Sequence, residues 1–241
     1  CIRDRGVMDW SWELLDDVEQ ALLSRLAVFA GVFELEEVQG ICGDVDDAAV
    51  VVGALVSKSL AERLDESETA RFRLLETVRL YSQQKLVDRG EADDLRDRHL
   101  RWYVNRCRGD DFALNMLSLE HVSWYRRSFD NVLAAIDWAL SSDDHDAAAT
   151  LVAAGASQMF GQIGHIGQEL VDVAERLLNL VDNPATRARL LVTQAWMGWA
   201  AYDIPLIHRA SDRAVEAGRQ ADDPHALVMA AVQWSVASSP R

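Results

Sequence analysis

Lysine is scarce in this chain of 241 residues: it occurs only at Lys58 and Lys85, and every other basic residue is arginine. Acidic residues outnumber basic ones by 39 to 24, which gives a formal net charge of −15. Residues 1–90 hold 10 basic and 18 acidic side chains and the remainder holds 14 and 21, so both parts are acidic. Nucleic-acid-binding domains usually carry a basic face for the phosphates. The composition therefore predicts no direct nucleic-acid partner.

Cysteine is also rare, and long apolar runs are missing. Cys1, Cys42 and Cys107 lie far apart without CxxC or metal-ligand spacing, which predicts reduced, structural thiols. No run reaches the roughly 18 apolar residues that a membrane helix needs, and no apolar leader opens the chain. We therefore expect a cytoplasmic protein without a membrane partner. The start at Cys1, without methionine, suggests a segment of a longer protein.

Motifs of nucleotide, metal and nucleophilic chemistry are absent. The chain has no GxxxxGK[ST] phosphate loop, no HExxH zinc motif and no GxSxG nucleophile motif. The glycine cluster Gly161–Gly167 follows a predicted helix instead of a strand, so we interpret it as a turn between helices. The acidic clusters Asp44–Asp47 and Asp143–Asp146 precede predicted helices, which favours helix capping over cation binding. We predict a non-enzymatic segment with no catalytic residue, metal or cofactor of its own.

The N-terminal part has the element order of a winged helix. Apolar spacing predicts a short helix and then a longer one between Trp10 and Phe29, with Asp17 as N-cap of the second and Gln20 completing a capping box. Two strand-like runs then flank the polar hairpin Asp65–Thr69. The other predicted elements are helices over Phe33–Ile41, Asp46–Leu60 and Glu76–Gly90 and strands over Ala61–Leu64 and Arg71–Leu74. We assign residues 1–90 to a winged-helix subdomain with a two-stranded wing.

The remainder, residues 91–241, carries helical spacing without a strand signal. A weak repeat places Trp196 and Trp234 at equivalent positions, 38 residues apart. The predicted helices are Ala92–Cys107, Leu117–Ser123, Tyr125–Leu140, Asp146–Gly161, Ile166–Leu180, Ala185–Ala201, Pro205–Gln220 and Pro224–Val236. Helix pairs near this period stack into solenoids. We therefore predict a mainly α protein in which the winged helix is followed by an all-α, TPR-like array of helical hairpins.

Three segments, Met8–Leu15, Arg71–Leu86 and Asp130–Leu140, resemble bacterial signalling ATPases of the STAND class, related to LuxR- and AfsR-type regulators and to NB-ARC proteins. Leu95–Tyr103 fits the same pattern, so the resemblance covers most of the chain. In that family an ATPase core precedes the winged helix and a TPR-like array follows it. The resemblance implies ATP or ADP in an upstream domain of the same chain, a winged helix that packs on that domain, and a protein or small-molecule effector on the array.

The resemblance also implies a position for nucleotide contact. Leu74–Thr77 occupies the place where NB-ARC relatives carry a Met-His-Asp motif, and Leu75 replaces the histidine. Leucine cannot donate a hydrogen bond to a phosphate. Glu76 and Arg79 remain candidates for contacts with the nucleotide-binding core, and the alternative for them is a solvated ion pair one helical turn apart.

Binding of DNA is the alternative function that a winged helix raises. The helix expected to read DNA, Asp46–Leu60, is mostly alanine and valine and offers Lys58 as its only basic side chain. The wing tip carries Asp65, Glu66 and Glu68, which repel phosphates. The sequence therefore favours a protein-facing winged helix over a DNA-binding transcription factor.

A candidate effector groove lies in the predicted array. Helical phase turns Thr193 and Trp196 away from the packing face, and Trp234 and Gln158 fall at equivalent positions of neighbouring units. Two tryptophans on a concave wall could hold a peptide or an apolar effector. The alternative is that both rings belong to the core. The leading hypothesis is thus a non-catalytic regulatory segment of a STAND-type regulator.

Overall fold

The computed structural model describes residues 2–43, 45, 47–64, 70–108, 119–155 and 167–238. The chain divides into two compact units, Cys1–Trp102 with Ser128–Ala135 and Tyr103–Arg127 with Ile136–Arg241. This division passes through two helices, α6 (Ala92–Cys107) and α9 (Phe129–Ser141). The predicted hairpin Asp65–Thr69 and Gln158 lie outside the described residues, as does the glycine cluster up to residue 166.

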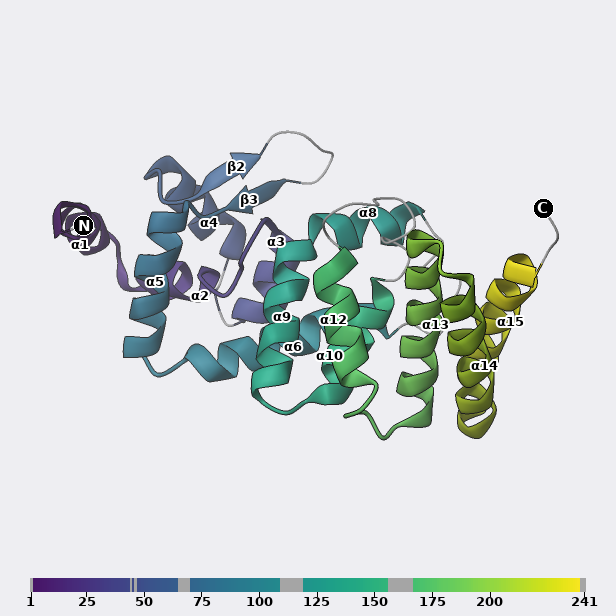
Figure 1. Cartoon of the computed structure of the whole chain (residues 1–241). Coiled ribbons are helices and arrows are strands. Elements are labelled where there is room, and N and C mark those ends of the chain that lie inside the picture. Colours follow the sequence, from purple (N-terminus) through teal and green to yellow (C-terminus); the bar gives the residue numbers. More distant parts are fainter. Residues whose placement is uncertain are drawn as a thin grey trace. The chain divides into compact units, whose positions relative to one another are not determined.

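The N-terminal unit has the element order of a winged helix (Figure 1). Its elements are α1 (Ile2–Glu13), α2 (Asp17–Leu26), β1 (Phe33–Glu34), α3 (Leu35–Glu37), the π-helix η1 (Val38–Cys42), α4 (Ala48–Ser57), β2 (Glu62–Leu64), β3 (Arg71–Arg73) and α5 (Glu76–Asp88). Helices thus surround a small antiparallel sheet, which confirms the predicted fold class.

The sheet has one strand more than the sequence predicted. Its order is β1-β3-β2, and Phe33 of β1 lies opposite Phe72 of β3. The predicted helix Phe33–Ile41 was therefore wrong at its start, where the chain is extended. Phe33 stacks on Phe29 with ring centroids 4.7 Å apart and lies 6.1 Å from the ring of Phe72. Tertiary packing of this ring overrides the local helical spacing.

The second correction concerns the start of α2. The N-cap is Asp16 and not the predicted Asp17, and the capping box is completed by Glu19 instead of Gln20. The Asp16 carboxylate accepts from the backbone N–H of Glu19 at 2.9 Å, and the Glu19 carboxylate accepts from that of Asp16 at 3.0 Å. Because Asp16 and Asp17 are adjacent and both suit the position, sequence alone could not separate them.

The core of the N-terminal unit is aliphatic and aromatic. Its fully buried side chains include Leu22, Leu23, Leu26, Phe29, Phe33, Ile41, Val52 and Leu55. His99 from α6 is buried against the edge of Phe29, with ring centroids 5.8 Å apart. The first turns of α6 therefore belong to this core.

The second unit is a stack of helices within the described residues. Besides the ends of α6 and α9 it contains α8 (Leu119–Arg127), α10 (His145–Ala154), α12 (Gly167–Leu177), α13 (Pro184–Ala201), α14 (Ile204–Ala221) and α15 (Pro224–Ser238). α13 packs against α10, α12 and α14, and α15 packs against α14 and α13 (Figure 1). The predicted helix Ala92–Cys107 matches α6 at both ends, and the last three predicted helices agree to within two residues.

Five of the described helices end in one type of turn. A residue with φ between 52° and 70° follows the last turn, and the next backbone N–H donates to the carbonyl five residues back. The left-handed residues are Ser59, Gly90, Asp143, Tyr202 and Asp222. In three of these turns the next residue, Asp144, Asp203 or Asp223, caps the following helix with its carboxylate. This confirms capping at Asp144 in one acidic cluster, whereas Asp47 of the other cluster is the N-cap residue of α4 but makes no side-chain capping hydrogen bond. The turns between α13 and α14 and between α14 and α15 reverse the chain with two residues.

Candidate docking face of the winged helix

α4 is the helix that would read DNA in a winged helix, and its outer face is apolar. It buries Ala48, Val52 and Leu55 in the core. Val50 is 64% exposed, and a Cβ placed on the exposed Gly53 would meet open space. From Ala48 to Ser57 the helix contains no charged residue. This face can bury apolar surface against a protein but offers no charge to a phosphate.

Lys58, the basic residue at the end of α4, is already paired. Its Nζ lies 2.6 Å from both carboxylate oxygens of Glu19 on α2. The Glu19 side chain is only 9% exposed, whereas that of Lys58 is 40% exposed. Moving this ammonium to a DNA phosphate would leave a shielded carboxylate without its partner, which is unfavourable.

The described strands of the wing also carry paired charges. Arg73 of β3 donates to Glu62 of β2 at 2.7 Å, across the strand pair. Arg63 and Arg71 each have interaction partners as well. The wing therefore does not present a row of free arginines, even though it contains three.

Glu76 and Arg79 form the ion pair that the sequence offered as the alternative to nucleotide contact. Arg79 donates to both carboxylate oxygens of Glu76, at 2.8 and 2.9 Å. The hydrogen bond from Arg79 lowers the pKa of the Glu76 carboxyl, and the same bond raises the pKa of the guanidinium. Leu75 precedes them as the N-cap of α5 and is 41% exposed.

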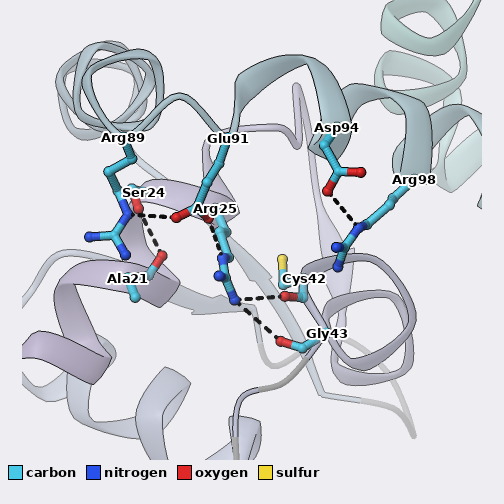
Figure 2. A network of polar contacts seen from close by, with 9 residues as sticks. All are labelled: Ala21, Ser24, Arg25, Cys42, Gly43, Arg89, Glu91, Asp94 and Arg98. Atoms are coloured by element: carbon cyan, nitrogen blue, oxygen red, sulfur yellow. Dashed lines mark hydrogen bonds and ion pairs between the residues drawn. The ribbon is translucent and has the colours of Figure 1, made fainter.

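An arginine at the end of α2 joins three segments of the N-terminal unit (Figure 2). Arg25 donates to Glu91 at 2.8 Å and to the carbonyls of Cys42 and Gly43, at 3.1 and 3.4 Å, where η1 ends. Glu91 also accepts from Arg89 at 3.0 Å. Both guanidinium partners oppose the effect of burial, and the pKa of the Glu91 carboxyl is lowered. The π-helix, which leaves carbonyls free at its end, is capped in this way.

Asn131 was part of a segment singled out by resemblance, and the structure gives it a physical role. Its side chain is fully buried at the start of α9. The amide nitrogen donates to the carbonyl of Val32 at 2.7 Å, and the amide oxygen accepts from the N–H of Gly31 at 3.0 Å. A Cβ at Gly31 would come within 2.9 Å of Asp130, so this close approach requires glycine. The sequence did not predict these two hydrogen bonds, which we call the Asn131 clasp, because they join residues about 100 positions apart.

The candidate effector residues on the array do not share one environment. Thr193 is fully buried in α13, and its hydroxyl donates to the carbonyl of Arg189. Trp196 is partly buried, whereas Trp234 is 45% exposed and contacts His208 of α14 edge-on at 5.4 Å. Gln158 lies outside the described residues. Thr193 offers no exposed surface to a ligand, so only the two tryptophans carry the hypothesis further.

The described cysteines are buried thiols. Burial raises the pKa of both Cys42 and Cys107 to about 12, so neither is a thiolate at neutral pH. The described residues contain no group of three or more His, Cys, Asp or Glu side chains that could hold a metal ion. Among the helices formed by the described residues, none is long and apolar enough to cross a membrane.

Comparison with known sequences agrees with the fold of the N-terminal unit. Residues 15–87 match the family described as the winged helix-turn-helix domain. These residues form a winged helix-turn-helix domain. The match contains α2, α4, the three-stranded sheet and nearly all of α5.

Relatives extend the similarity to most of the chain. The chain is 31% identical over 239 residues to a provisionally named HTH-type transcriptional regulator of Mycobacterium tuberculosis strain H37Rv, covering 94% of this chain and 27% of the relative. The counterpart in Mycobacterium bovis has the same identity and coverage. An uncharacterized protein of Mycobacterium tuberculosis is 39% identical over 93 residues, 36% of this chain and 24% of that protein. The chain thus spans about a quarter of the length of these curated relatives. No solved structure matches it.

Proposed function

We propose that this chain is the non-catalytic regulatory segment of a signal-transducing ATPase of the STAND class. The winged helix docks on an upstream nucleotide-binding core, and the TPR-like helices receive an effector or partner protein. One observation carries this proposal: the outer face of α4 is exposed, apolar and free of charge, and it includes the exposed Val50. A face of this kind stabilises a protein interface when it is buried.

Regulation in this proposal acts through a difference in affinity. An effector that binds the array more tightly when the winged helix is released from the core shifts the closed-to-open equilibrium by that difference in binding free energy. The chain itself supplies docking and sensing surfaces. ATP or ADP belongs to the upstream domain, where a GxxxxGK[ST] loop is expected in the gene on the Cys1 side.

A second function, direct DNA binding, is favoured by the names of the relatives as HTH-type transcriptional regulators. The paired Lys58 and the apolar α4 face argue that DNA contact, if the whole protein makes it, comes from another part of the polypeptide.

The docking proposal is tested with a polypeptide from the same gene that includes the upstream core. Val50→Asp places a carboxylate in the proposed interface and is expected to increase nucleotide exchange and protease sensitivity at the junction. Val87→Asp is the matched control, because Val87 is 52% exposed on α5 and lies outside the α4 face. An equal response to both substitutions, or a gene without a phosphate loop upstream, contradicts the proposal.

The non-enzymatic part of the proposal is tested on the 241-residue chain alone. Calorimetry with Mg-ATP is expected to give no heat of binding and no turnover, because the chain has no phosphate loop. Micromolar binding with unit stoichiometry would show that the nucleotide site lies in this segment.

A further inference from the structure

The outer face of α15 is the second apolar surface that the described residues leave uncovered. α15 runs from Pro224 to Ser238 and contains no Asp, Glu, Lys or Arg. Its inner face is buried at Ala226, Met229, Ala230 and Gln233. On the opposite side, Val228 is 58% and Val232 is 49% exposed. Ala231 and Ser235 are exposed on the same side. A helix that is apolar on all sides is normally covered on all sides.

The neighbouring helix shows how a helix that faces water is built in this chain. α14 packs between α13 and α15 and still carries charges on its exposed positions, among them Arg209, Asp212, Arg213, Glu216 and Arg219. α15, at the edge of the described stack, packs on α13 and α14 and contains no Asp, Glu, Lys or Arg. A terminal helix of a solenoid usually has a polar outer side that keeps it soluble. The composition of α15 is therefore that of an internal helix.

The weak repeat of the sequence supports the same conclusion. Thirty-eight residues before Val228 lies Leu190 of α13, which is fully buried, and 38 residues before Ser235 lies Met197, which is 5% exposed. α13 has packed helices on both sides, α10 and α12 before it and α14 and α15 after it. Thr193, the equivalent of Ala231, is also fully buried, and Gln194, the equivalent of Val232, is half-buried. Three of these four exposed positions of α15 are thus buried in the equivalent helix that has neighbours on both sides.

We propose that the outer face of α15 binds a further helical hairpin of the same polypeptide, so that α15 is an internal helix of a longer array. The curated relatives, of which this chain spans 27%, have the length for such a hairpin. A second copy of this chain is less favoured as the partner of this face. Two α15 helices would meet along only a few turns, whereas a stable dimer buries about 800 Å² per partner. A hairpin in the same polypeptide needs only the two-residue turn that already joins α13 to α14 and α14 to α15.

The test compares the 241-residue chain with a product of the same gene extended only beyond Arg241. In the 241-residue chain, Val232→Asp faces water and is expected to leave the Tm almost unchanged. In the extended polypeptide the same substitution is expected to lower the Tm by about 5 °C or more, because the carboxylate becomes buried. Val87→Asp, an exposed valine of the other unit, is the control and should have no effect in either form.

Three outcomes overturn the proposal. One is an extended polypeptide that tolerates Val232→Asp. Another is a 241-residue chain that elutes as a dimer by light scattering and becomes monomeric with Val232→Asp, which assigns the face to a second copy. The third is a gene that encodes no residues beyond Arg241. None of these results bears on docking through α4, which is tested separately.

Discussion

His99 is the buried ionisable side chain with the clearest consequence for stability. Burial against Phe29 lowers the pKa of its imidazole from 6.5 to about 3. Between these pH values the unfolded chain binds one proton more than the folded chain, so the free energy of unfolding decreases as the pH falls. The loss from this one residue is up to ~1.4 kcal/mol per pH unit below the unfolded pKa.

We expect urea unfolding of the parent chain between pH 7 and pH 4 to show this decrease, and His99→Gln to flatten it. Glutamine keeps the size of a polar side chain and does not titrate. The burial of His121 lowers its pKa in the same direction, so part of the slope should remain. An unchanged slope in His99→Gln would mean that His99 is not held neutral in the folded protein.

Asn131 is a buried polar side chain whose removal should loosen the N-terminal unit. Asn131→Ala leaves the Gly31 N–H and the Val32 carbonyl without their partner, and we expect a loss of roughly 2–4 kcal/mol in the free energy of unfolding. Asp137→Ala, an exposed position on the same helix, is the control and should cost little. A small loss at Asn131, equal to that at Asp137, would show that the clasp is not formed in solution.

Among the helices, the end of α13 shows where sequence reasoning succeeded and where it could not. The prediction Ala185–Ala201 agrees with α13, yet the turn that ends it contains Tyr202 in a left-handed conformation, with φ of 56°. Glycine is the usual residue there, and of the five such turns described only that at Gly90 has it. Of these turns, the sequence indicated a capping aspartate only at the Asp143–Asp146 cluster.

Local sequence patterns could not predict strand β1, because its pairing partner lies far away in the sequence. Two residues, Phe33 and Glu34, pair with a strand almost forty residues later, and nothing near them in sequence signals an extended conformation. Gly40 is similar: a Cβ there would lie 2.0 Å from the ring of Trp102, so this glycine serves a contact between distant segments. Of the candidate site, the apolar α4 face was visible in the sequence, whereas the Lys58–Glu19 pair and the Asn131 clasp depend on such distant contacts.

Tyr202→Gly is expected to stabilise the protein, although it removes a large side chain. Tyr202 is 77% exposed, so little packing is lost, and glycine adopts the left-handed conformation without the penalty of a Cβ. The left-handed conformation costs an L-residue roughly 1–2 kcal/mol, and the greater unfolded-state freedom of glycine offsets roughly 0.5–1 kcal/mol of this, so we predict a net gain of about 0.5–1 kcal/mol by thermal or urea unfolding. Asp203→Ala, which removes the adjacent cap of α14, should instead cost about 1 kcal/mol. Destabilisation by Tyr202→Gly would indicate that the ring makes contacts that its exposure does not suggest.

Truncation of the two tryptophans of the candidate groove should lower the free energy of unfolding by different amounts. Trp196 is partly buried in a helix packed on several sides, so Trp196→Ala is expected to cost about 3 kcal/mol or more. Trp234 is 45% exposed, and Trp234→Ala should cost about 1 kcal/mol. Iodide quenching of each single variant shows which ring is accessible. Small and equal costs with two quenchable rings would restore a groove lined by both tryptophans.

The sequence has an acidic net charge, and the described residues expose apolar faces on α4 and on α15. A net negative charge opposes contact with phosphates, and exposed apolar helix faces are common at protein interfaces. Both properties agree with a segment that works between other parts of a longer polypeptide. Residues 15–87 match a winged helix-turn-helix domain, while the helix expected to read DNA has an exposed apolar face, as the proposed docking requires.

Fluorescence anisotropy with labelled duplex DNA tests this account most directly. We predict no appreciable binding of the 241-residue chain to random or genomic duplexes at physiological salt, because α4 is apolar and Lys58 is paired with Glu19. Submicromolar binding that weakens with increasing salt and is lost in Lys58→Ala would contradict it and identify the winged helix as a DNA reader.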